Sequence, residues 1–174
     1  ITADNTRITP LDGADVTFEN NDTADTLTVG AGVSGVEIND VTFDQATNDD
    51  AAIAISNNAD NVDISGNAFT NVIDSDAQNV VSVADGAAAV TIDNNDFTGD
   101  GVAATAINVT DTGADQLDLT VTNSDITGFD DPDGEAGEAI ILANDISAAT
   151  IENNNFDNND QHVDDEAGVT TLNT

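Results

Sequence analysis

A repeated spacing of apolar residues constrains the fold of this 174-residue chain more than any other feature. In five segments, apolar residues fall at positions i, i+2 and i+7, and each segment is preceded by a second apolar pair. These preceding pairs begin at Leu27, Ile53, Val81, Ile107 and Ile140, so the copies are 26 to 33 residues apart. The spacing inside a copy is constant, except for three extra residues in the fourth, while the outer loop varies in length. This combination indicates a repeat protein.

Each copy predicts short β-strands and no helix. Apolar and polar residues alternate with the period of two that strands require, and Asn and Gly residues separate the strands. Three strands per copy predict an all-β fold, a single-stranded parallel solenoid of about five to six coils in one domain, 1–174. We assign residues 1–24 to a partial N-terminal coil or cap, 25–167 to five coils, and 168–174 to the start of a further coil.

Stacked coils place equivalent residues about 4.8 Å apart, so the repeat also predicts which side chains stack on each other. One interior column is aliphatic and a second is mainly aromatic. The aliphatic column consists of Ile38, Ile64, Ile92, Val121 and Ile151, and the aromatic column consists of Phe43, Phe69, Phe97, Ile126 and Phe156. At the turn between them, Asn94, Asn123 and Asn153 align, because Asn tolerates a left-handed backbone. Thr residues such as Thr91, Thr120 and Thr150 form outward columns.

The segments Val62–Phe69, Val90–Phe97 and Ala149–Phe156 share a strand, an Asn-containing turn and a following apolar residue. In this they resemble the right-handed parallel β-helix repeats of the pectin-lyase-like superfamily, over roughly residues 25 to 172. The resemblance implies a right-handed parallel β-helix. It implies little about function, because that fold carries lyases, hydrolases, adhesins and fibres.

The charge of the chain excludes several classes of partner. Arg7 is the only Lys or Arg against 35 Asp and Glu, which gives a net charge of −34. Nucleic acid and anionic membrane surfaces both require basic residues, and no apolar run is long enough to span a membrane. The composition resembles that of proteins from extreme halophiles, where a Debye length of about 3 Å at 1 M salt screens the repulsion. An acidic calcium-binding secreted protein is the alternative.

Two groups of carboxylates are candidate cation sites. The variable loop of the fourth copy carries Asp130, Asp131, Asp133 and Glu135, while Asp96 and Asp125 are expected to stack outward in adjacent coils. Hard oxygen ligands suit Ca²⁺, although the loop departs from the Asp-x-Asp-x-Asp-Gly spacing of calcium loops. A solvated acidic edge adapted to salt is the alternative. We expect no required cofactor, with Ca²⁺ or other cations as optional ligands of this edge.

The sequence argues against an enzyme. Lyases of the resembling superfamily use a basic residue to abstract a proton, and Arg7 precedes the first full coil, so lyase chemistry is nearly excluded. Hydrolases of this fold use paired Asp residues, but Trp and Tyr, which usually line sugar subsites, are absent. A carbohydrate-binding or glycoside-hydrolysing protein is the alternative, and an exposed Phe129 beside Asp130 would favour it. His162 is expected in an exposed acidic loop.

The two ends of the repeat predict self-association. Val16 and Phe18 match the second strand of an incomplete coil whose first strand lies near Ile8, and Val169 and Leu172 begin a further coil. Open coils that meet head-to-tail would build a homopolymer. Residues 1–15 acting as a cap, or a truncated longer parent, are the alternatives. We therefore predict a non-catalytic structural protein, extracellular or at the cell surface of an extreme halophile, which forms filaments or fibres.

Overall fold

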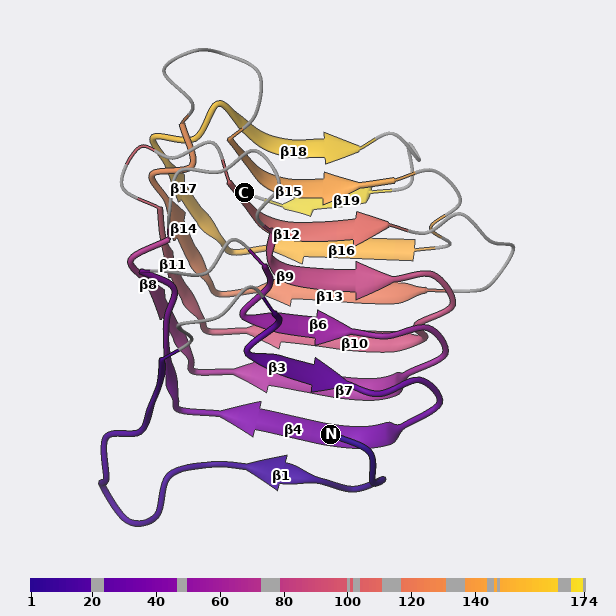
Figure 1. The fold of residues 1–174 in the computed structure, drawn as a ribbon. Coiled ribbons are helices and arrows are strands. Elements are labelled where there is room, and N and C mark those ends of the chain that lie inside the picture. The colour runs from indigo at the N-terminus through magenta and orange to yellow at the C-terminus, as the bar shows by residue number, and fades with distance from the viewer. Residues whose placement is uncertain are drawn as a thin grey trace.

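The computed structural model describes residues 1–19, 24–46, 50–72, 79–99, 101, 104–110, 117–130, 137–143, 146 and 148–165, and the backbone of 170–173. Within these residues the chain forms three parallel β-sheets and no helix. Figure 1 shows the strands of each sheet stacked one above another, from β1 at the bottom to β18 at the top. The predicted all-β parallel solenoid is therefore confirmed.

The three sheets take one strand each from successive coils. Sheet A, with seven strands, contains β1 (Arg7–Ile8), β4 (Ser34–Asn39), β7 (Asp60–Ser65), β10 (Ala89–Asp93), β13 (Asp118–Thr122), β16 (Ala148–Glu152) and β19 (Thr170–Asn173). Sheet B contains β2 (Thr17–Glu19), β5 (Thr42–Asp44), β8 (Ala68–Thr70), β11 (Asp96–Thr98), β14 (Asp125–Thr127) and β17 (Asn155–Asp157). Sheet C contains β3 (Leu27–Val29), β6 (Ile53–Ile55), β9 (Asn79–Ala84), β12 (Thr105–Thr110), β15 (Glu138–Leu142) and β18 (Gln161–Asp165).

The interior columns stack as the repeat predicts. In sheet A the aliphatic column runs in register from Ile38 to Ile151, and each of its members is buried. In sheet B the ring of Phe69 stacks between Phe43, at 5.1 Å, and Phe97, at 4.5 Å between ring centroids. Such ring contacts add about 0.5–1.5 kcal/mol each to the free energy gained from burial. The core is thus one continuous rod of apolar side chains surrounded by the three sheets.

The turn between sheets A and B is held by side-chain hydrogen bonds that run along the solenoid. Asn94, Asn123 and Asn153 adopt the predicted left-handed backbone, with φ of 54°, 53° and 57°. The next residue of each turn accepts a hydrogen bond from the preceding coil: Asn67 N donates to Asn95 Oδ1 at 2.9 Å, and Asn95 N donates to Ser124 Oγ at 3.1 Å. These buried polar groups therefore satisfy each other from coil to coil, as buried polar groups must.

The strand assignment at the N-terminus is wrong by one strand. Ile8 is in register with Ile38 and Phe18 with Phe43, so these residues occupy the second and third strands of a coil, not the first and second. The reason is an insertion, since five more residues separate Ile8 from Phe18 than separate Ile38 from Phe43. The backbone of Ile1 accepts a hydrogen bond from Gly30 N at 2.8 Å. Residues 1–8 therefore extend the coil and do not fold across its end.

The C-terminal assignment also changes. The further coil begins with β18, in which Val163 is in register with Ile140, and β19 is its second strand, with Leu172 in register with Ile151. The sequence hides β18 because its other inward register position holds Asp165, which lies opposite Leu142. The number of coils differs slightly from the predicted five to six.

Candidate functional site

The acidic loop of the fourth copy is described only at its first residue. Asp130 is exposed and follows the end of β14 by three residues, and Asp131, Asp133 and Glu135 lie outside the described residues. Phe129, the residue before it, is fully buried, with an exposed fraction of 0%. The ring is therefore part of the core, and the exposed aromatic surface that would have favoured a sugar site here is absent.

The second candidate cation site is brought together only in part. Asp96 and Asp125 are in register on β11 and β14 and both are exposed, as the repeat predicts. The same column continues with Ala68 on one side and Asn155 on the other, so two carboxylates meet there and no third joins them in register. Among the described residues, no group of three or more His, Asp or Glu side chains is arranged to hold a metal ion.

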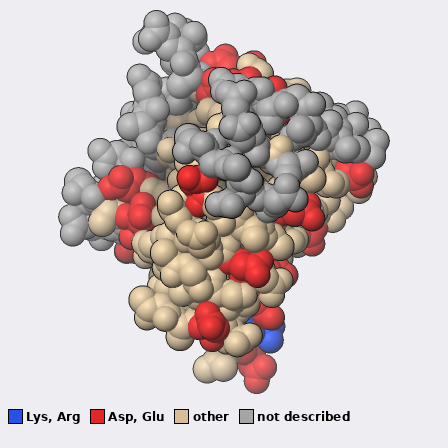
Figure 2. Space-filling model, turned by 90° about the vertical axis from the view of Figure 1, so that its right-hand side faces the viewer, with Lys and Arg blue, Asp and Glu red and all other residues tan. Residues whose placement is uncertain are grey.

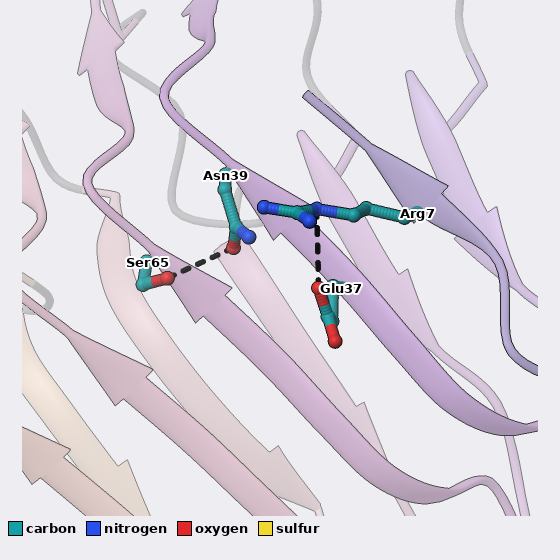
Figure 3. Close-up of polar contacts among 4 residues, drawn as sticks. All are labelled: Arg7, Glu37, Asn39 and Ser65. Carbon is teal, nitrogen blue, oxygen red and sulfur yellow. Dashed lines mark hydrogen bonds and ion pairs between the residues drawn. The ribbon is translucent and has the colours of Figure 1, made fainter. Parts of the chain in front are cut away.

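The structure reveals a polar groove that the sequence analysis missed. It lies on the outer face of sheet A, has a volume of about 210 Å³, and is lined by Asn5, Thr6, Arg7, Gly35, Val36, Glu37, Asn61 and Asp63. Glu37 and Asp63 are in register on adjacent strands, and Arg7 Nε lies 3.2 Å from Glu37 Oε2 (Figure 3). The repeat contained only the alignment of Glu37 with Asp63, since both occupy the outward position that Thr91 occupies in the next copy, and it gave no signal for the position of Arg7.

In this groove Arg7 and Glu37 form an ion pair, whereas one carboxylate oxygen of Asp63 has no hydrogen-bond partner among the described residues. The side chains of Arg7 and Glu37 are 62% and 50% exposed, so their ion pair contributes only about 0–1 kcal/mol to stability. Asp63 Oδ1 is buried and has no hydrogen-bond partner among the described residues. A carboxylate oxygen in this position is available to accept a hydrogen bond from a ligand or from water.

The N-terminal end of the solenoid exposes apolar side chains at the end of each interior column. Ile1, Ile8, Val16, Phe18 and Leu27 pack on the core from one side only and are half-buried. The ring of Phe18 stacks on Phe43 at 5.3 Å between centroids, which makes it the last ring of the aromatic column. Val16 contributes its carbonyl, which accepts a hydrogen bond from Thr42 N at 2.9 Å.

The C-terminal end has the same character but more charge. Phe156 and Val163 are half-buried against the core. His162 belongs to strand β18, not to a loop, and its exposed ring stacks on Phe156 at 5.2 Å and 13°. Leu172 occupies the register position beside Ile151, whereas Val169 lies outside the described residues.

The acidic residues are spread along the solenoid, whereas the basic residue is not. Figure 2 shows carboxylate residues along the length of the face in view and basic atoms only at its lower end. That end is where β1 carries Arg7, the single basic residue other than His162. The single arginine of the chain therefore lies at the N-terminal end of the solenoid.

No protein-family model, curated protein or solved structure matches this chain, so its function has to be inferred from the fold and its surfaces. Membership of the pectin-lyase-like superfamily stays a prediction, while the parallel β-solenoid stands on the structure itself. None of the described segments forms a helix that is long and apolar enough to cross a membrane.

Proposed function

We propose that this protein is a non-catalytic structural β-solenoid that stacks head-to-tail into filaments at the surface of an extreme halophile. The observation that carries the proposal is the position of the half-buried apolar side chains. Along the shaft the core residues are closed off from water, and the half-buried ones that pack against them lie in the first coils and the last. Burial of such surface contributes about 25 cal/mol per Å², so each end gains by docking on another.

The charge of the chain supports a saline environment for this assembly. Two copies that each carry −34 repel each other at low ionic strength, and only screening allows their ends to meet. The acidic composition and the pectin-lyase-like repeats together favour a secreted β-helix of haloarchaeal type. Acidic chains suit either side of the membrane in such an organism, so fractionation of the producing cells tests the surface location separately.

Electron microscopy of the purified chain in molar KCl tests the proposal directly. We expect uniform filaments with an axial repeat of roughly 25–35 Å, the height of the stacked strands at about 4.8 Å each. The same sample at low salt is the control, and we expect short or no filaments there. Single particles of uniform size at every salt concentration would refute head-to-tail stacking.

Cations that bridge carboxylates belong to the same proposal. Like charges directly opposite each other on neighbouring strands are destabilising, so the in-register pair Asp96 and Asp125 would gain from a shared Ca²⁺. We expect added Ca²⁺ at constant ionic strength to raise the melting temperature of the natural chain more than that of Asp125→Asn. Equal shifts for the two proteins would remove this pair from the proposal.

Carbohydrate binding is the second candidate function, and the groove on sheet A is the observation that favours it. Its lining combines a guanidinium, two carboxylates and two Asn side chains, which can pair with several hydroxyl groups of a sugar. Binding of neutral and acidic polysaccharides in molar salt, compared between the natural chain and Asp63→Asn, tests this. If neither protein binds or cleaves any polysaccharide, the candidate is refuted.

A further inference from the structure

We infer that the seam between copies is a strand pairing across sheet A alone, in which β19 of one copy joins β1 of the next. This inference rests on the proposed head-to-tail stacking and specifies which edges meet. Each end of the solenoid offers three strand edges, namely β1, β2 and β3 at the N-terminal end and β17, β18 and β19 at the C-terminal end. The three possible pairings differ in whether the backbone of each edge strand is free to form hydrogen bonds, in the charged residues that would face each other, and in the residues that already cover each edge.

The edges of sheet C do not fit each other. At the N-terminal end, the outer edge of β3 is occupied by Ile1, whose carbonyl accepts a hydrogen bond from Gly30 N and whose nitrogen donates to Thr28 O. At the C-terminal end, β18 carries Asp164 and Asp165, and Asp165 stands in register with the buried Leu142. A charged residue at an inward position is a known device that prevents further strands from adding to an edge.

The edges of sheet B are also unfavourable. The ring of His162 stacks on Phe156, so the aromatic column is already covered at the C-terminal end. A further copy could place Phe18 on Phe156 only by displacing His162. Both edge strands also carry a carboxylate, Asp157 on β17 and Glu19 on β2, and these would lie in the same outward column.

The edges of sheet A fit each other in charge and in register. β19 (Thr170–Asn173) is the one C-terminal edge strand without an acidic residue, and β1 contains Arg7, the one basic residue of the strands at either end apart from His162. Both strands end the order of sheet A, and the described chain places no strand beyond either of them. The pairing therefore places no like charges on facing strands, because β19 has no charged residue and Arg7 of β1 is paired with Glu37.

The columns of sheet A continue across this seam. Thr171 is in register with Thr150, and Arg7 with Glu37, so docking places Thr171 beside Arg7 of the next copy. The same backbone register places residue 172 opposite Ile8 of the next copy, at the register position of Ile151 and Ile38. All pairings within the sheet are parallel, and a head-to-tail copy supplies a strand in that direction. Such a contact is heterologous and propagates into a filament.

The natural chain contains no cysteine, so introduced cysteines can form disulfides only with each other. Such disulfides therefore report which strands meet between copies. By continuation of the register, Thr9 of one copy lies opposite Asn173 of another, about 4.8 Å away and within the distance that a disulfide spans. We mix the single variants Thr9→Cys and Asn173→Cys in molar KCl and oxidise them. The matched control for a sheet B seam is the mixture of Thr17→Cys and Asn155→Cys. Neither pair removes Arg7 or an apolar residue of the ends.

We expect the sheet A mixture to convert to covalent heterodimers, while each single variant alone and the sheet B mixture stay monomeric on a non-reducing gel. Filaments of the natural chain in the microscope report on the proposed function, and the cross-link pattern reports on the seam. Filaments without the sheet A cross-link, or with the sheet B cross-link, would overturn the seam and leave the proposed function standing. If no filaments form, the proposed head-to-tail stacking and the sheet A pairing are both refuted.

Discussion

The substitution Asn95→Ala tests whether the polar column at the turn holds neighbouring coils together. Asn95 is 3% exposed, and its side chain spans the coil boundary. Its Nδ2 donates to Ile64 O at 2.9 Å and to Asp93 O at 3.1 Å, while its Oδ1 accepts from Asn67 N at 2.9 Å and from Asn67 Nδ2 at 3.1 Å. The substitution removes all four hydrogen bonds and leaves Asn67 N buried without its acceptor.

The expected cost is about 3–5 kcal/mol in the free energy of unfolding. Two lost donated bonds contribute about 1 kcal/mol each, and a buried donor without a partner costs about 1–3 kcal/mol. The chain itself offers the matched control, because Ser124 occupies the same position one coil later. Its Oγ accepts from Asn95 N at 3.1 Å and donates to Thr122 O at 3.0 Å. Asn95→Ser therefore keeps an acceptor for Asn67 N and a donor to Asp93 O, and we expect about half the loss.

Urea unfolding at constant molar KCl, followed by circular dichroism, measures both variants without changing the ionic strength. The order natural chain, Asn95→Ser, Asn95→Ala in decreasing stability is the expected result. A loss below about 1 kcal/mol for Asn95→Ala, which is the net value of a single ordinary hydrogen bond, would refute the reasoning. Equal losses for the two variants would show that the Ser hydroxyl does not substitute for the amide.

Three further predictions concern packing, charge and assembly. Phe69→Ala removes a fully buried ring that stacks on both faces, so we expect a loss of about 3–5 kcal/mol in urea unfolding, against a clearly smaller loss for the half-buried Phe156→Ala. The melting temperature of the natural chain should rise steeply from 0.1 to 1 M KCl, as the Debye length falls from about 10 to 3 Å, and a flat salt profile would contradict the electrostatic account. Arg7→Glu should raise the salt concentration needed for filaments, whereas Arg7→Lys should leave it nearly unchanged; light scattering distinguishes the two, and identical thresholds would exclude a role for this charge.

Sequence reasoning predicts the central coils well because their strands in sheets A and C each carry at least two inward apolar residues, and their strands in sheet B each carry one. The spacing of Ile64 to Phe69 recurs without a gap, so the register followed from the repeat alone. The prediction from sequence fails at the two ends of the solenoid, where the inward positions are not all apolar. β18 holds Val163 but Asp165 at the second position, and the insertion between Ile8 and Phe18 hides the first coil. Strands at an open end are freed from the demand for burial, and the pattern weakens there.

The candidate surfaces were predicted less completely than the fold. The stacking of Asp96 on Asp125 follows from the repeat, because equivalent positions must align. The groove beside Asp63 does not, because it depends on where a separate segment carrying Arg7 adds to sheet A. The contact of His162 with Phe156 was equally hidden, since it depends on β18 being a strand. Residues in regular columns are predictable from spacing, and contacts made by irregular segments are not.

The parallel register of all three sheets determines how the molecule responds to tension. Hydrogen bonds between coils point along the solenoid axis, so a pull from the two ends loads the bonds between coils and not those within a turn. The end coils, with fewer neighbours, yield first, and each step releases one copy of 26 to 33 residues. At about 3.3–3.6 Å per extended residue, a single unfolded coil extends to roughly 9–12 nm of chain. A single molecule pulled from its two ends therefore lengthens in small, repeatable increments, one coil at a time.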